Sequence, residues 1–222
     1  MTPAYSAKRA YRSIRAARTY ERDRFSSLLG RYRYLRERSA VSRIVKMLPW
    51  GSVILDCPCG IGRWWPVLSK KASTIIAADI SDEMLAVAYD FQRAGVAPVS
   101  LMRCDAEQIP LADNSVDYVF SHALTKHLPV PVQYAVLAEL ARVARKGVVS
   151  SCGIFTPLTY EIWRRRNLVE SYPLQPEELN RMAAAAGLKL VRKIRCTTVV
   201  GVEHTVLLEK CAAVKASGAS LE

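Results

Sequence analysis

Short apolar runs alternate with amphipathic segments along most of the chain. Five short runs are predicted strands: 52–57, 74–78, 99–104, 116–121 and 147–155. The first is almost continuously apolar, as expected of a strand buried on both faces. Four segments with helical spacing of their apolar residues follow these runs: 63–71, 81–93, 131–144 and 177–186. Because strands alternate with helices, we expect parallel βαβ units and an α/β fold with a doubly wound sheet.

Two more predicted strands, 189–197 and 204–210, complete the pattern. Their connection is too short for a parallel crossover, so we expect them to pair antiparallel. With 222 residues and 50% hydrophobic composition, the chain is long enough for one domain with a substantial core. It contains no apolar run of the eighteen or more residues that a transmembrane helix needs, so we predict no membrane span.

The first residues lack the apolar core of a secretory signal, so we expect a cytoplasmic protein. Their Arg and Ser content leaves a mitochondrial transit peptide as an alternative. In a reducing compartment the six cysteines are not a disulfide framework, and those in or beside predicted strands should be buried: Cys57, Cys104, Cys152 and Cys196. No Cys/His pair follows Cys57 and Cys59 at zinc spacing, so we expect no metal.

The net charge of +12 is concentrated at the start of the chain. Residues 1–49 hold thirteen Lys or Arg and three acids, a net charge of +10, and the rest of the chain carries +2. Five of the ten Tyr residues also lie there. We expect a basic N-terminal arm with three possible roles: a lid over a ligand, a nucleic-acid contact, or a solvated helix.

A glycine-containing loop, residues 56–62 (DCPCGIG), follows the first predicted strand. In an open α/β sheet, ligands bind at the carboxyl ends of the strands, and Gly60 and Gly62 would let the backbone approach one closely. The acids Asp56, Asp79 and Asp105 each end a successive predicted strand. The third glycine of a dinucleotide-binding loop is missing, so the pattern fits an adenosyl ligand better than a pyrophosphate cofactor.

Several motifs are similar to those of the class I S-adenosylmethionine (SAM)-dependent methyltransferases, particularly the group that acts on small molecules and lipids. VILDCPCGIGRW resembles a variant of the first motif, and IIAADISDEMLAVA resembles the second. CDAEQIPLADNSVDYVFSHALTKHL, ELARVARKG and PEELNRMAAAAGLKLV are similar to later segments of the family. The resemblance covers about residues 20–210. It implies a Rossmann-like seven-stranded sheet in the order 3-2-1-4-5-7-6, with strand 7 antiparallel.

The resemblance also implies SAM as cofactor. The residues that it places around SAM are Asp56, Cys57, Pro58, Gly60, Gly62, Asp79, Ile80, Met84, Asp105, Ala106, Ser121 and His122. It divides the chain into a basic helical arm or lid (1–48), a SAM-binding methyltransferase domain (49–211) and a flexible tail (212–222). Two departures stand out: Arg145-Lys146-Gly147 replaces the usual Pro-Gly-Gly before the fifth strand, and Pro58 has no N–H to offer a ligand.

His122 and His127 are the candidate catalytic residues. His122 follows the fourth strand and is a candidate general base, while we expect His127 to be a satisfied core histidine more readily than a catalytic one. Methyl transfer to a good nucleophile often needs positioning alone, so no base is required. Candidate lid and substrate residues are Tyr20, Arg24, Phe25, Arg31, Tyr160 and Trp163.

The predicted function is methyl transfer from SAM to a small molecule, with acidic molecules among the candidate substrates, by a monomer or homodimer. Two alternatives stay open. The basic arm also suits an RNA methyltransferase, and a protein with this site could use SAM for non-methyl chemistry or as a structural ligand.

Overall fold

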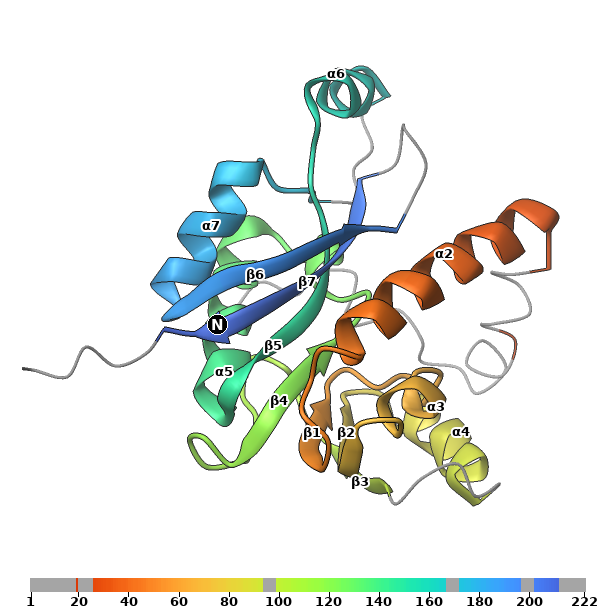
Figure 1. Cartoon of the computed structure of the whole chain (residues 1–222). Helices are drawn as coiled ribbons and strands as arrows, with labels where there is room; N and C mark the ends of the chain where they lie inside the picture. Colours follow the sequence, from red (N-terminus) through yellow and green to blue (C-terminus); the bar gives the residue numbers. More distant parts are fainter. Residues whose placement is uncertain (1–18, 20–25, 94–98, 167–171, 197–201, 212–222) are drawn as a thin grey trace, which may run out of the picture.

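The computed structural model describes residues 19, 26–93, 99–166, 172–196 and 202–211. Within them, one seven-stranded sheet has the order β3-β2-β1-β4-β5-β7-β6 (Figure 1). The strands are β1 (Ser52–Asp56), β2 (Ala72–Asp79), β3 (Val99–Arg103), β4 (Val116–Ser121), β5 (Ala144–Gly153), β6 (Leu188–Arg195) and β7 (Glu203–Lys210). Strands β1 to β5 pair in parallel, and β7 pairs antiparallel with both β5 and β6. The predicted strand order and the antiparallel last strand are confirmed.

The described helices lie on both faces of the sheet (Figure 1). They are α2 (Leu28–Val45), α3 (Trp65–Leu68), α4 (Asp82–Arg93), α5 (Val130–Val143), α6 (Pro157–Arg166) and α7 (Pro176–Ala185), with a short 3₁₀ helix η2 (Thr125–His127). None of them is both long and apolar enough to cross a membrane. Ser81 caps α4, since its Oγ accepts a hydrogen bond from the Met84 N–H over 3.2 Å.

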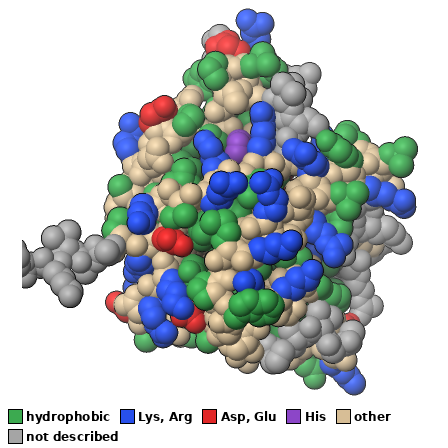
Figure 2. Space-filling view, in the orientation of Figure 1, with side chains coloured by type: hydrophobic (Ala, Val, Ile, Leu, Met, Phe, Trp, Pro, Cys, Tyr) green, Lys and Arg blue, Asp and Glu red, His purple; other side chains and the backbone are tan. Residues whose placement is uncertain are grey.

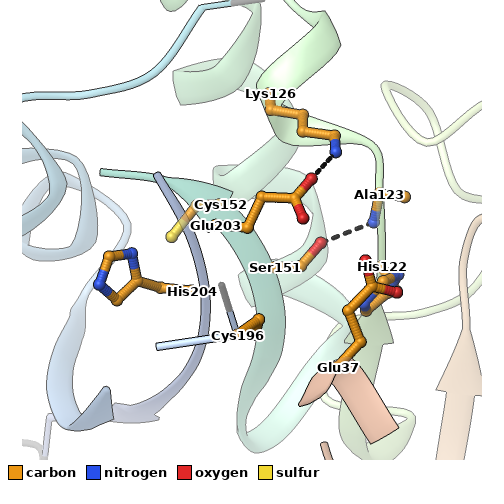
Figure 3. A pocket seen from close by; sticks show the side chains of 9 residues that line it. All are labelled: Glu37, His122, Ala123, Lys126, Ser151, Cys152, Cys196, Glu203 and His204. Atoms are coloured by element: carbon orange, nitrogen blue, oxygen red, sulfur yellow. Dashed lines mark hydrogen bonds and ion pairs between the residues drawn. The ribbon is translucent and has the colours of Figure 1, made fainter. Parts of the chain in front are cut away.

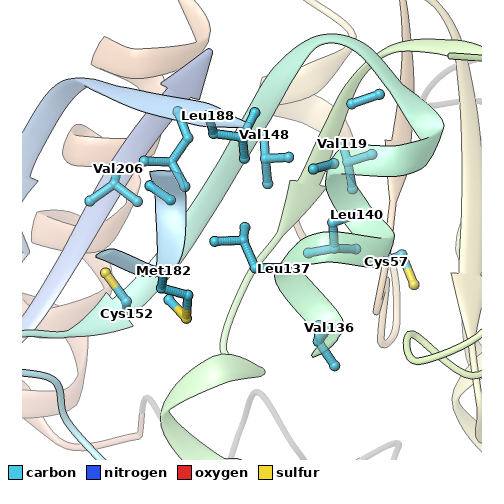
Figure 4. Close-up of a cluster of buried hydrophobic side chains, with 14 of the residues drawn as sticks. Cys57, Val119, Val136, Leu137, Leu140, Val148, Cys152, Met182, Leu188 and Val206 are labelled. Carbon is cyan, nitrogen blue, oxygen red and sulfur yellow. The ribbon is translucent and has the colours of Figure 1, made fainter. Parts of the chain in front are cut away.

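Two apolar cores cover the two faces of the sheet. One contains Leu137 and Leu140 of α5 and Met182 of α7, packed on β4, β5 and β7 (Figure 4). The other contains side chains from α2, α3 and α4 packed on β1, β2 and β4. Ala40, Val41, Ile44 and Val45 of α2 belong to this second core, so the C-terminal half of α2 is part of the folded unit.

Three local predictions differ from the structure. The helix expected at 63–71 is shorter, because the loop holds Gly62 at φ +83° and α3 begins only at Trp65, next to Pro66. Strand β5 begins at Ala144, directly after α5 and three residues earlier than expected. Arg145 and Lys146, which we placed before this strand, therefore lie inside it, and a Cβ added at Gly147 would come within 2.3 Å of the Leu208 carbonyl oxygen.

Candidate functional site

The loop between β1 and α3 lies at the carboxyl edge of the parallel strands. Gly60 and Gly62 both have positive φ, +54° and +83°, which favours glycine. The Gly60 N–H donates a hydrogen bond of 2.8 Å to Asp79 Oδ2, which ties the loop to the end of β2. A Cβ added at Gly60 would meet no atom within 4 Å, so the loop faces open space there.

Asp56 ends β1 and is buried beneath this loop. Its Oδ2 accepts a hydrogen bond of 3.0 Å from the Trp65 indole N–H. Its Oδ1 is also buried but has no hydrogen-bond partner among the described residues. Burial raises the pKa of this carboxyl well above its usual range, an effect that the Trp65 hydrogen bond only partly offsets. Asp56 thus keeps a buried acceptor that a donor group of a ligand can satisfy.

Asp79 ends β2, and backbone N–H groups contact both of its oxygens. Oδ1 accepts from the Ser81 N–H over 3.0 Å and Oδ2 from the Gly60 N–H. Burial raises the pKa of Asp79, and these hydrogen bonds counteract the rise. Because a carboxylate has about four lone-pair sites, it can still accept hydrogen bonds from hydroxyl groups of a ligand.

The remaining residues predicted to surround SAM lie near the ends of β1, β2 and β3. Asp105 is half-buried, and its Oδ1 accepts a hydrogen bond of 3.1 Å from the Glu107 N–H. Ala106, Ile80 and Pro58 are half-buried, and Met84 is buried. The Cys57 side chain points away from the loop into the first core, where its Sγ lies 4.0 Å from Cys104 Sγ.

The predicted burial of the cysteines is confirmed, since Cys57, Cys104, Cys152 and Cys196 are all buried. Burial also raises the pKa of the Cys152 thiol to about 12 and that of the Cys196 thiol to about 11. These two thiols are therefore protonated at neutral pH.

Ser121 and His122 follow each other at the end of β4. Ser121 is buried, and its hydroxyl oxygen has no hydrogen-bond partner within the part of the chain that the structure describes. The His122 ring lies 4.7 Å from the Trp64 ring and stacks on Phe120 at 6.0 Å, measured between centroids. Its Nδ1 lies 3.4 Å from Arg63 Nη2. A guanidinium can only donate, so Nδ1 accepts in this arrangement.

A buried charged cluster beside His122 was not predicted from the sequence. Arg63 Nη1 lies 3.6 Å from Glu37 Oε2, and the side chains are only 7% and 5% exposed. The Arg63 guanidinium also lies over the Trp64 ring at 4.6 Å. Two features of the sequence could have indicated it. Arg63-Trp64-Trp65 directly follows the glycine loop, and Glu37 is the single acid among the arginines of residues 28–45.

Past the ends of β4 and β5, the structure has a small pocket that opens to solvent (Figure 3). It is lined by Glu37, His122, Ala123, Lys126, Ser151, Cys152, Cys196, Glu203 and His204. Lys126 forms an ion pair with Glu203, and Ser151 Oγ accepts a hydrogen bond of 2.6 Å from the Ala123 N–H. The sequence pointed to His122 alone among these residues, because the others come from five separate segments.

The second candidate histidine lies elsewhere. His127 is exposed at the end of η2 and is absent from the lining of this pocket. The expectation of a core position for His127 is therefore wrong. Leu128, the next residue, takes the fully buried position at this end of η2.

The substrate and lid candidates are only partly described. Arg31 is exposed on α2, and Tyr160 of α6 packs edge-on against Phe155 at 5.3 Å between ring centroids. Tyr20, Arg24, Phe25 and the side chain of Trp163 lie outside the described residues. Neither Arg31 nor Tyr160 lines the pocket in Figure 3.

Comparisons with known proteins match the part of the chain that contains the glycine loop. Residues 54–147 match a family model described as a methyltransferase domain. The demethylmenaquinone methyltransferase of Geobacillus stearothermophilus is 31% identical over 134 residues, which cover 59% of this chain and 56% of the relative. The chain thus spans about half the length of the curated relatives it matches.

Solved structures share the fold. Magnesium protoporphyrin IX methyltransferase from Synechocystis PCC 6803, crystallised with bound S-adenosylhomocysteine, superposes with a TM-score of 0.70 at 17% identity, covering 83% of this chain and 88% of that one. The [4+2]-cyclase SpnF superposes with a TM-score of 0.59 at 16% identity, covering 76% and 80%. The family match over residues 54–147 and the strand order both agree with the resemblance to the class I SAM-dependent methyltransferases.

Proposed function

We propose that this protein is a SAM-dependent methyltransferase that acts on a small molecule. The observation that carries the proposal is an unsatisfied buried acceptor at the end of β1, together with open space at a glycine of the loop that follows. Asp56 Oδ1 has no partner among the described residues, and nothing lies within 4 Å of the Cβ position of Gly60. A ligand that fills the space beside Gly60 and donates to Asp56 would satisfy both features.

SAM has the groups that this site lacks. Its methionine ammonium would donate to Asp56, and its ribose hydroxyls would donate to the remaining lone pairs of Asp79. Asp105 and Ala106 would border the adenine, and Ser121 the methionine part. When bound, SAM supplies a methyl group on a positively charged sulfur. The domain resemblance and the neighbours crystallised with SAM or its product support this assignment.

The pocket beside His122 would receive the methyl acceptor. His122 is fixed between Trp64 and Phe120, and its Nδ1 accepts from Arg63. In this arrangement the second ring nitrogen, Nε2, carries the proton, so His122 would orient the acceptor by donating a hydrogen bond. Rate enhancement would then come from positioning, as expected for transfer to a good nucleophile.

The pocket favours a small acceptor without strong negative charge. Its described lining has two carboxylates, Glu37 and Glu203, against the one ammonium of Lys126, which is already paired with Glu203. Small-molecule substrates appear in the names of the relatives, demethylmenaquinone and magnesium protoporphyrin. Residues around Arg31 and the segment before α2 would act as the lid, in a cytoplasmic monomer or homodimer.

Calorimetric titration tests the cofactor. The wild type should bind SAM with a dissociation constant on the order of micromolar, and Asp79→Ala should abolish the heat of binding. Asp113→Asn, at an exposed acid that pairs with Arg142, is the matched control and should bind as the wild type does. A wild-type protein that binds neither SAM nor S-adenosylhomocysteine would refute the proposal.

Two other functions make different predictions. An RNA methyltransferase would show salt-sensitive RNA affinity that deletion of residues 1–18 removes while the core helix α2 stays intact. Non-methyl chemistry is suggested by the likeness to a protein named as a [4+2]-cyclase. Mass spectrometry separates this case, since turnover without S-adenosylhomocysteine would exclude methyl transfer.

A further inference from the structure

The outward face of α2 has an exposed apolar stripe. Leu28, Tyr32 and Leu35 are 85%, 46% and 60% exposed. At 100° per residue these three positions fall within about 60° of one another. They lie opposite the face that α2 buries, which contains Glu37, Val41 and Ile44. Such a stripe is costly in water, so it indicates a contact surface.

Arginines flank this stripe on both sides. The same helical spacing places Arg31 and Arg38 along one side of the stripe and Arg36 and Arg43 along the other. All four are exposed, and the one acid of α2, Glu37, is buried on the opposite face. Figure 2 shows Lys and Arg side chains gathered over α2 and β6 on the face in view, with apolar side chains among them where α2 begins.

We propose that the outward face of α2 binds the surface of an anionic lipid bilayer. Exposed leucines between two rows of arginines match the requirements of an interfacial helix, in which the apolar side chains enter the acyl boundary and the cations meet the phosphates. Nucleic acid would use the arginines but would leave Leu28 and Leu35 in water. A bilayer accounts for both features.

Helix α2 lies between the proposed bilayer contact and the pocket. Its inner face carries Glu37, which lines the pocket and lies 3.6 Å from Arg63 at the glycine loop. The two faces of one helix therefore connect the bilayer surface with the pocket. The docking surface itself does not depend on methyl transfer, since it rests on exposed side chains outside the SAM site.

Vesicle co-sedimentation with the full chain tests the proposal. One set of vesicles contains phosphatidylcholine alone and the other equal parts of phosphatidylcholine and phosphatidylglycerol. The wild type should sediment with the anionic vesicles only. The double variants Leu28→Ser/Leu35→Ser and Arg36→Gln/Arg38→Gln should each lower the partition coefficient roughly tenfold or more.

Matched controls come from α6, which also has an exposed leucine and an exposed arginine. Leu158→Ser and Arg165→Gln should bind vesicles as the wild type does. Circular dichroism and SAM titration on every variant show that the fold and the cofactor site are unchanged.

Three results would overturn the proposal. If Leu28→Ser/Leu35→Ser keeps wild-type binding, the contact is purely electrostatic and does not involve the stripe. If no vesicle binds, and ultracentrifugation shows a dimer that the leucine variant dissociates, the stripe meets a second copy of the chain. If single-stranded RNA binds and anionic vesicles do not, the arginines serve nucleic acid.

Discussion

The Arg63 guanidinium lies 3.6 Å from the Glu37 carboxylate, and both side chains are almost completely buried. This pair joins the end of the glycine loop to the middle of α2, and Arg63 also reaches His122 Nδ1 at 3.4 Å. One cation thus connects the glycine loop, helix α2 and the pocket beside His122. The position of α2 and that of His122 should therefore depend on the same ion pair.

Loss of the Glu37 charge should destabilise the fold. Glu37→Gln leaves the Arg63 charge buried without its carboxylate, which costs about 3 kcal/mol in comparable buried pairs. Urea unfolding should show this drop in the free energy of unfolding. The control is Glu161→Gln, which removes a 3.9 Å pair with exposed Arg165 and should cost roughly 0.5 kcal/mol or less. Equal losses in the two variants would contradict a buried pair that organises the site.

Neutralising Asp56 should stabilise the protein while removing its cofactor affinity. Because burial raises the folded pKa of Asp56 above its unfolded value, stability is lost as the pH rises from the unfolded pKa, about 3.9, through the folded one. The Asp56→Asn side chain does not ionise, so its stability does not fall with rising pH in this way. Its amide oxygen can still accept the hydrogen bond from the Trp65 indole N–H. At neutral pH we expect a gain of roughly 1 kcal/mol, or about 2–4 °C in melting temperature.

The same variant should bind SAM at least about tenfold more weakly, since an amide cannot neutralise an ammonium. Differential scanning fluorimetry at several pH values and calorimetry with SAM measure the two effects. The melting temperatures of wild type and variant should converge as the pH approaches 4. If Asp56→Asn is less stable than the wild type at neutral pH, the fold stabilises the ionised Asp56 carboxylate and the prediction is wrong.

Alanine at the two loop glycines should have two different effects. A Cβ at Gly62 would lie 2.7 Å from the Trp65 ring, so Gly62→Ala should destabilise the fold by about 2 kcal/mol or more. Gly60→Ala meets only open space and should cost about 1 kcal/mol for its positive φ. The methyl group of Gly60→Ala would occupy space that we assign to SAM. This variant should therefore lose more SAM binding free energy than folding stability. Thermal melts and SAM titration of both variants separate the two outcomes.

The strand order could be predicted because the apolar runs, the resemblance and the short last connection agree with one another. The acids at the strand ends were found for the same reason, since each directly follows a buried run. The contacts of Arg63 could not be found in this way. Its partner Glu37 lies 26 residues earlier, and neither residue follows a predicted strand.

The pocket was missed because tertiary packing alone brings its lining together. Lys126 meets Glu203 across 77 residues of sequence, and Glu203 begins the last strand of the sheet. Helix α2 was partly misread for a similar reason. Its arginines suggested a solvated or ligand-binding arm, whereas the positions between them, from Ala40 to Val45, fill a core that only the folded sheet creates.

His204 should make stability depend on pH in the acidic range. Burial, with the nearby charges of Lys193 and Arg195, lowers the pKa of this imidazole, although the hydrogen bond of Nδ1 to the Val202 carbonyl, 2.8 Å long, opposes the shift. A histidine with a depressed folded pKa contributes stability above its unfolded pKa of about 6.5 and loses it as the pH falls towards the folded value. The difference in unfolding free energy between wild type and His204→Gln should therefore shrink between about pH 7.5 and pH 5. Exposed His127→Gln, measured by urea unfolding at the same pH values, is the control for the loss of an imidazole. A difference that stays constant or grows on acidification would mean that His204 is protonated as readily in the fold as in the unfolded chain.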